Sequence, residues 1–204
     1  MRTDVRIDWT IPPLARGVTG ALQRFFGPGA KRGEYLVQAV GGVLCLALLV
    51  WWTARGFRDW SAGQIVVALL IAFDVVGGVL TNATNAAKRW YHRQAPGMTR
   101  ERLLFVGVHV LHLAAVAFVL RTGAWPWFLL NAVVLAGSAL LVEFVPLEVK
   151  RPVAMATLLA AVALNEILAP LPGALGWFVP FFYLKLLVCH LVPEAPMSRR
   201  APDA

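Results

Sequence analysis

The chain has 204 residues, of which 59% are hydrophobic and only 15% are charged. Soluble domains are typically about 45–50% apolar and 25% charged, so the composition excludes an ordinary soluble protein and indicates an integral membrane protein. A signal peptide does not explain the excess, because the first 33 residues carry six Lys and Arg and no apolar stretch. Cys45 and Cys189 form neither a CxxC motif nor a disulfide framework, which disfavours redox-active thiols.

Six mostly apolar runs, each long enough to cross a bilayer, follow one another along the chain. They lie near residues 35–54, 62–83, 102–120, 125–145, 152–170 and 174–192. The runs are continuously apolar rather than alternating, so they predict helices and not the strands of a barrel. Pro170, Pro172 and Gly173 interrupt the last two runs and predict a tight hairpin there. The predicted fold is therefore all-α, a polytopic membrane protein with six transmembrane helices in one bundle.

The ends of the chain differ from this bundle in composition. We predict a cytoplasmic N-terminal segment over residues 1–33, a six-helix transmembrane domain over 34–193 and a disordered cytoplasmic tail over 194–204. Within the first segment, a helix from Trp9 to Phe26 would place four apolar residues on one side, namely Leu14, Val18, Leu22 and Phe25. An amphipathic helix of this kind typically lies on the membrane surface.

The basic residues outside the spans are divided 15 to 3 between the two sides of the predicted bundle. Both termini lie on the side with 15, and the other side holds only Arg55, Arg58 and Arg121. Because Lys and Arg accumulate in cytoplasmic loops, the split predicts both termini in the cytoplasm and a multi-pass protein of the cell (inner) membrane. The net charge of +8 then reflects topology and contact with the lipid bilayer, so we predict no nucleic-acid partner.

The second predicted span carries an unusual polar face. Steps of 3.6 residues from Asp74 reach a series of small and polar residues: Gly78, Thr81, Asn85, Lys88 or Arg89, and His92. Asn82 lies beside this face, and the pattern predicts a helix that continues beyond the bilayer. Gly77 and Gly78 fit either close helix packing, the more common reason, or backbone approach to a ligand.

Two other spans place ionisable residues at a similar depth. His109 and His112 are three residues apart in the third span and share one helix face. The sixth span adds Tyr183 and Lys185. Counted from the span ends, Asp74, His112 and Lys185 lie near mid-membrane, where an ionisable side chain costs several kcal/mol and is a functional candidate by default. We therefore predict one interior site.

The residue types at this site suit acid–base or metal-assisted chemistry on a lipophilic small molecule. The predicted catalytic residues are Asp74, His109, His112 and Lys185, and the predicted substrate-binding residues are Asn82, Asn85, Tyr183 and His92. His109, His112 and Asp74 also form a three-ligand set for a divalent metal, which is a possible cofactor, although the HxxH spacing is weakly specific and no HExxH motif is present.

Other functions remain open at this stage. The polar face also suits a proton- or ion-coupled small transporter, and a homo-oligomer could supply its second half. A structural protein with a buried Asp74–Lys185 ion pair is the third possibility. Bis-histidine haem ligation is disfavoured, because His109 and His112 share a helix. Four further polar residues lie closer to water and are expected to be solvated or paired with loop arginines, namely Glu143, Glu148, Asn165 and Glu166.

Overall fold

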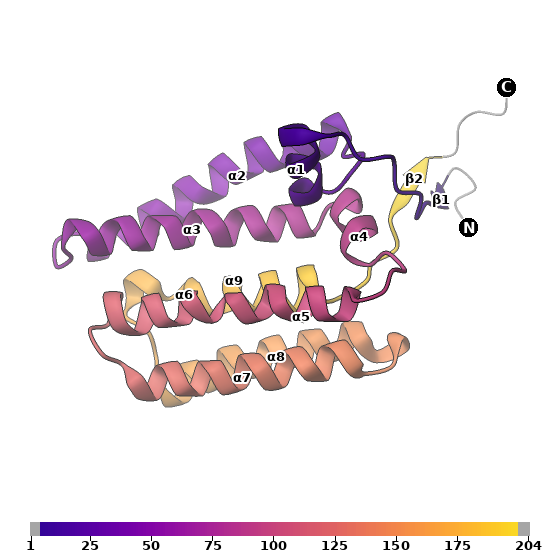
Figure 1. Cartoon of the computed structure of the whole chain (residues 1–204). Helices are drawn as coiled ribbons and strands as arrows, with labels where there is room; N and C mark the ends of the chain where they lie inside the picture. Colours follow the sequence, from indigo (N-terminus) through magenta and orange to yellow (C-terminus); the bar gives the residue numbers. More distant parts are fainter. Residues whose placement is uncertain (1–4, 200–204) are drawn as a thin grey trace, which may run out of the picture.

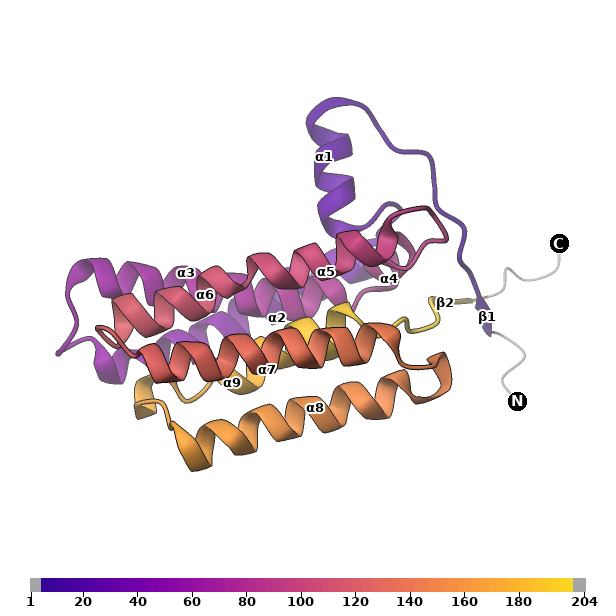
Figure 2. The ribbon, with the colours of Figure 1, turned by 60° about the horizontal axis from the view of Figure 1, so that its bottom comes forward.

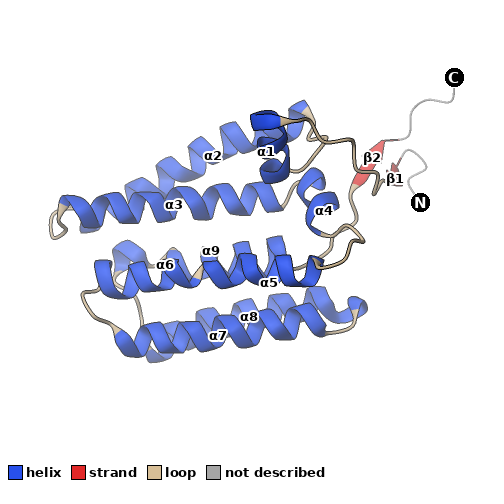
Figure 3. Ribbon diagram, viewed as in Figure 1, coloured by secondary structure: helices blue, strands red, loops and turns tan. Residues whose placement is uncertain are grey.

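A computed structural model describes residues 5–199, which form a helical bundle with two short strands at one end (Figure 3). Within this range, six helical segments are long and apolar enough to cross a membrane. The all-α, polytopic fold predicted from the sequence is confirmed. The segments run over Arg32–Gly56, Ala62–Asn82, Met98–Leu120, Trp125–Phe144, Leu147–Leu168 and Gly173–His190.

Some spans consist of several consecutive helices. The first contains α2 (Arg32–Thr53) and η1 (Ala54–Gly56), and the second is α3 (Ala62–Asn82). The third contains α5 (Met98–Val108), α6 (Val110–Ala114) and the π-helix η2 (Ala115–Leu120). The fourth and fifth are α7 (Trp125–Phe144) and α8 (Leu147–Leu168). The sixth contains η3 (Gly173–Leu175), α9 (Phe178–Tyr183) and the π-helix η4 (Leu184–His190).

The span boundaries have local causes. Ser61 begins α3, since its hydroxyl accepts from the Gln64 amide while the Gln64 side chain accepts from the Ser61 amide. Pro146 precedes α8, and the predicted hairpin between the last two spans is confirmed because α8 ends at Leu168 and η3 begins at Gly173.

The sixth span is the most buried of the six, and it packs against α3, α7 and α8. The first span is the least buried and packs mainly along α3 (Figure 1). A charged residue on the central sixth span cannot reach the bundle surface by a simple rotamer change, so Lys185 needs an internal partner.

Both described ends of the chain lie at the same end of the bundle (Figure 1). There, β1 (Val5–Ile7) and β2 (Met197–Arg199) pair as antiparallel strands. The start of the tail that we expected to be disordered thus forms a strand against the N-terminal segment, and residues 200–204 lie outside the described range. The position of both described ends at one end of the bundle agrees with an even number of candidate spans.

The amphipathic helix is shorter than predicted. Helix α1 covers only Gly17–Phe26, because the backbone of Arg16, directly before it, is extended with φ −91° and ψ 162°. Val18, Leu22 and Phe25 remain exposed, and α1 runs across the direction of the spans (Figure 2). This arrangement fits the predicted position on the membrane surface.

The second span does not continue as one helix toward His92, so this part of the sequence prediction is wrong. Helix α3 ends at Asn82, and a separate helix, α4 (Asn85–Tyr91), begins after Thr84, whose hydroxyl accepts from the Ala87 amide. A residue that caps a new helix has an extended backbone and therefore redirects the chain. The polar face that starts at Asp74 is consequently interrupted at this point.

Cysteine labelling tests the predicted orientation. In a chain whose two free cysteines are replaced, we expect Gln94→Cys to react from the cytoplasmic side and Asp59→Cys from the opposite side, because both positions are exposed in loops at opposite ends of the bundle. The measurement is modification by a membrane-impermeant maleimide in intact cells. Reaction of Gln94→Cys but not Asp59→Cys under those conditions would reverse the assignment.

Candidate functional site

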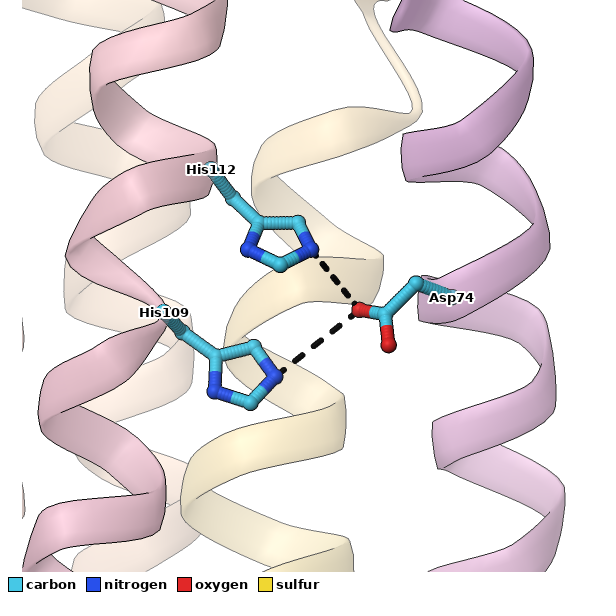
Figure 4. Close-up of side chains that lie close together, drawn as sticks. All are labelled: Asp74, His109 and His112. Atoms are coloured by element: carbon cyan, nitrogen blue, oxygen red, sulfur yellow. Dashed lines mark ion pairs between the residues drawn. The ribbon is translucent and has the colours of Figure 1, made fainter.

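Four ionisable side chains from three spans meet inside the bundle. Asp74 comes from the middle of α3, His109 and His112 from the third span, and Lys185 from η4. The Asp74 Oδ2 atom lies 2.8 Å from His112 Nε2, 3.8 Å from His109 Nε2 and 2.5 Å from Lys185 Nζ. Figure 4 shows Asp74 pointing across the bundle toward both imidazoles. The predicted convergence of these spans is confirmed, and we call the four residues the polar cluster.

The surrounding contacts define the donor and acceptor at each ring. His109 Nδ1 lies 2.6 Å from the Phe105 carbonyl and therefore donates, which leaves the Nε2 lone pair directed at Lys185 Nζ, 2.7 Å away. His112 Nε2 donates to Asp74, while His112 Nδ1 is buried without a hydrogen-bond partner in the described residues. The cluster thus holds an ammonium, a carboxylate, an imidazole acceptor and an imidazole donor in direct contact.

Irregular helix geometry positions two members of the cluster. The His109 amide donates to the carbonyl of Val106, whereas a regular α-helix would use the carbonyl of Phe105. This tight turn separates α5 from α6. Lys185 lies near the start of the π-helix η4. Such turns re-aim side chains relative to a regular helix and are frequent at functional sites.

Gly78 allows Lys185 to reach Asp74. A Cβ atom at Gly78 would lie only 2.1 Å from Lys185 Cε and 2.9 Å from Nζ, whereas one at Gly77 would meet nothing within 4 Å. The lysine side chain therefore crosses α3 directly over Gly78, one turn from Asp74. From the sequence, close helix packing was the favoured role of Gly78. Its position one turn from Asp74 is the feature that could have indicated contact with a side chain that reaches Asp74.

Exposure within the polar cluster is uneven. The side chains of Lys185 and His109 are 1% and 5% exposed, whereas that of Asp74 is 44% exposed. All hydrogen bonds and ion pairs of the Asp74 carboxylate involve Oδ2, and none involves Oδ1 among residues 5–199. Helix α3 approaches the third span closely at η2 rather than at α5 or α6. The Asp74 side chain is therefore the exposed side of the polar cluster, and we call this exposed side the lateral opening.

The metal-site hypothesis has to account for Lys185. The ligand atoms of Asp74, His109 and His112 lie within 4.8 Å of one another, a spacing compatible with one ion. However, Lys185 Nζ lies against both Asp74 Oδ2 and His109 Nε2, where a shared cation would have to bind. A dication beside an ammonium would also be repelled. The four residues together therefore fit a metal poorly, and the three ligands fit one only when the lysine is elsewhere.

This conclusion predicts that shortening Lys185 exposes a metal site. In purified Lys185→Ala, Zn²⁺ should raise the melting temperature, because ions at about 100 times their dissociation constant stabilise a protein by about 2.7 kcal/mol. The wild type and the double variant Lys185→Ala/His109→Ala should not respond. Equal stabilisation of the wild type and Lys185→Ala would contradict this account of the lysine.

Among the described residues, no hydrogen bond or ion pair joins the predicted substrate-binding residues to the polar cluster. The Asn85 side chain pairs with the backbone of Met197, and Tyr183 donates to Asn131. His92 Nε2 lies 2.9 Å from the His190 carbonyl. Asn82 is buried, and its side-chain nitrogen has no hydrogen-bond partner within residues 5–199.

Two residues expected near water are buried instead. Glu143 is 2% exposed and pairs with Arg102 from the third span, while Lys150 donates to the Glu143 carbonyl. Asn165 forms reciprocal side-chain hydrogen bonds of 3.0 Å with Asn131. Pairing of Glu143 with a loop arginine is confirmed, because the predicted second connection includes Arg102, although Glu143 is buried rather than near water. The expectation is wrong for Asn165, which meets a complementary amide on a neighbouring span. Glu148 and Glu166 are exposed, as expected.

An aromatic stack borders the polar cluster and was not predicted. The Phe105 ring lies between two imidazoles, with ring centroids 4.7 Å from His109 and 4.1 Å from His190. His190 is buried, and neither of its ring nitrogens has a partner among the described residues. Phe105 therefore separates the polar cluster from the polar groups at the end of the bundle that carries the chain termini.

The Lys88 side chain caps the backbone carbonyls at that end of the sixth span. Its ammonium donates to the carbonyls of Cys189 and Val192, at 2.6 and 2.7 Å, which satisfies backbone groups left by the end of η4. Burial lowers the pKa of Lys88. Burial, together with the nearby Lys88 cation, also lowers the pKa of His92 from 6.5 to about 3. His92 is consequently neutral at physiological pH.

The His92 shift predicts acid sensitivity. Below pH 6.5 the unfolded chain binds a proton at this histidine, whereas the folded chain binds none until about pH 3. This difference in bound protons lowers the free energy of unfolding by at most about 1.4 kcal/mol per pH unit as the pH falls from 6.5 to about 3. His92→Gln keeps a donor for the His190 carbonyl and should show a shallower fall in melting temperature between pH 6.5 and 4. Identical acid profiles of the two proteins would contradict the assignment.

Comparison of the chain with protein-family models, with curated proteins and with solved structures finds no match.

Proposed function

We propose that this protein is an intramembrane enzyme that performs acid–base chemistry on a lipophilic substrate at the polar cluster. The observation that supports this most strongly is the exposed Asp74 carboxylate at mid-membrane depth. Asp74 lies 12 residues after the start of α3 and 8 before its end, which is about 18 and 12 Å at 1.5 Å per residue. A substrate dissolved in the bilayer would meet Asp74 through the lateral opening, without crossing an aqueous phase.

A purely structural ion pair accounts less well for this geometry. A pair that only fixes the register of two helices is most stable when both charges are shielded from the bilayer. Here Lys185 is fully buried but the side chain of Asp74 is 44% exposed. Two histidines also contact this ion pair, and fixing the register of two helices does not require them. An open carboxylate beside proton donors and acceptors is instead the arrangement that general acid–base catalysis uses.

Each residue has a chemical role in the proposal. Asp74 accepts a proton from the substrate or stabilises a developing positive charge, through its uncontacted Oδ1 atom. His112 supplies a proton from Nε2 and can regain one at Nδ1, its unpartnered nitrogen. Lys185 keeps Asp74 ionised, and His109 orients Lys185. A transport route toward the chain termini is less well supported, because the Phe105 ring separates His109 from His190.

Comparison of membrane lipids tests the proposal. Extracts from cells that express the wild type, Asp74→Asn or Glu148→Gln, at matched protein levels, are compared by untargeted mass spectrometry. We expect at least one lipid pair whose ratio changes in the wild type and in Glu148→Gln but not in Asp74→Asn, because Glu148 is exposed and far along the chain from the cluster. Indistinguishable extracts from the wild type and Asp74→Asn would contradict an enzymatic role.

A further inference from the structure

The contacts of Lys185 differ from those of the other lysines. The chain has four lysines, and Lys31 is exposed while Lys88 and Lys150 donate to backbone carbonyls. Lys185 Nζ instead lies 2.7 Å from an imidazole lone pair and 2.5 Å from a carboxylate. An imidazole can remove a proton from the ammonium, which a carbonyl oxygen does not do at physiological pH.

From this geometry we infer that Lys185 is a nucleophile that forms an imine with the carbonyl group of a lipophilic aldehyde or ketone. This inference rests on the proposed function and names its substrate class. A lysine amine reacts with carbonyl compounds when it is desolvated and an adjacent base removes its proton. Lys185 meets both conditions, because its side chain is 1% exposed and His109 Nε2 contacts Nζ.

The lateral opening provides access for the carbonyl group. Asp74 is the exposed member of the polar cluster and lies directly against Lys185 Nζ. A carbonyl carbon that enters beside Asp74 therefore approaches Nζ from the least buried side of the polar cluster. The remainder of a long-chain substrate stays in the bilayer, where its apolar surface is most stable.

The reaction balances without any further reactant. His109 accepts one proton from the Lys185 ammonium, and the nitrogen lone pair attacks the carbonyl carbon while the C=O π bond breaks. The nitrogen passes its second proton to the oxygen through His112, which is unchanged at the end of this transfer. The resulting hydroxyl takes the proton held by His109 and leaves as water, and the third proton stays on the nitrogen. The product is a protonated imine with Asp74 as its counter-ion, so one water is released and nothing is oxidised or reduced.

Reductive trapping tests the inference on the wild-type protein. Purified protein in phospholipid nanodiscs is incubated with hexadecanal and sodium cyanoborohydride, which reduces an imine to a stable amine. Peptide mapping then locates the alkyl group. We expect one adduct per chain, at Lys185, in preference to the exposed Lys31. Labelling that is equal at both lysines, or absent from Lys185, would overturn the inference.

Two variants separate a chemical role from a structural one. His109→Gln should slow labelling at Lys185 by roughly 100-fold, the usual contribution of a general base, while Glu148→Gln, which changes an exposed residue outside the polar cluster, should label at the wild-type rate. Equal rates in the two variants would remove the proposed base. If Asp74→Asn abolishes the lipid change described above but hexadecanal does not label Lys185, the enzyme proposal stands and the carbonyl inference fails.

Discussion

Replacing Lys185 by methionine is expected to lower the free energy of unfolding by about 3–5 kcal/mol, the usual cost of removing one partner from a buried ion pair. Methionine fills much of the same volume but leaves the Asp74 carboxylate without its closest cation. The measurement is equilibrium unfolding in mixed micelles.

The matched control is the double variant Lys185→Met/Asp74→Asn, which removes both charges. It should recover most of the lost stability, since no uncompensated charge remains. A single Lys185→Met variant within about 0.5 kcal/mol of the wild type, the range typical of neutral surface substitutions, would show that the ion pair is unimportant for the fold.

Gly78→Ala is expected to have nearly the same consequences as loss of the lysine. The new methyl group would overlap the end of the Lys185 side chain, which is flexible and can move only by leaving Asp74. The cost arises from the broken ion pair rather than from a rigid clash, so we expect about 2–3 kcal/mol of destabilisation and loss of aldehyde labelling at Lys185.

Gly77→Ala is the matched control, because a Cβ atom at this adjacent position meets nothing within 4 Å. It should be neutral or stabilising by up to about 1 kcal/mol, since alanine has the higher helix propensity. Both variants are compared by unfolding and by hexadecanal labelling. Similar behaviour of the two would mean that Lys185 does not depend on the space above Gly78.

The polar cluster was predictable from the sequence because its position depends mainly on membrane thickness, on the rise of a helix per residue and on the cost of exposing charge to lipid. Membrane thickness limits where each span begins and ends, and a helix rises 1.5 Å per residue, so counting places Asp74 and Lys185 at one depth. The cost of exposing charge to lipid then requires both to face inward. The direct contacts of Asp74 with His112 and Lys185 follow from these constraints.

Features that depend on local backbone geometry or on the order of helix packing were not predictable in the same way. The end of α3 at Asn82 had a sequence signal, since Thr84 is a typical N-cap residue for α4, but helical periodicity masked it. The burial of Glu143 depends on which span lies beside it, and hydropathy does not specify helix neighbours. The lateral opening likewise depends on the packing of α3 against η2 rather than α5.

Conversion of lipids by the purified protein is the most direct test of the central claim. Lipids extracted from cells that express Asp74→Asn are reconstituted into vesicles with purified wild type, Asp74→Asn or Glu148→Gln, and the vesicles are then analysed by mass spectrometry. The account predicts that the wild type and Glu148→Gln consume the same lipophilic species and form the same product, whereas Asp74→Asn forms none. Vesicle lipids that remain chemically unchanged after incubation with folded wild type would contradict it.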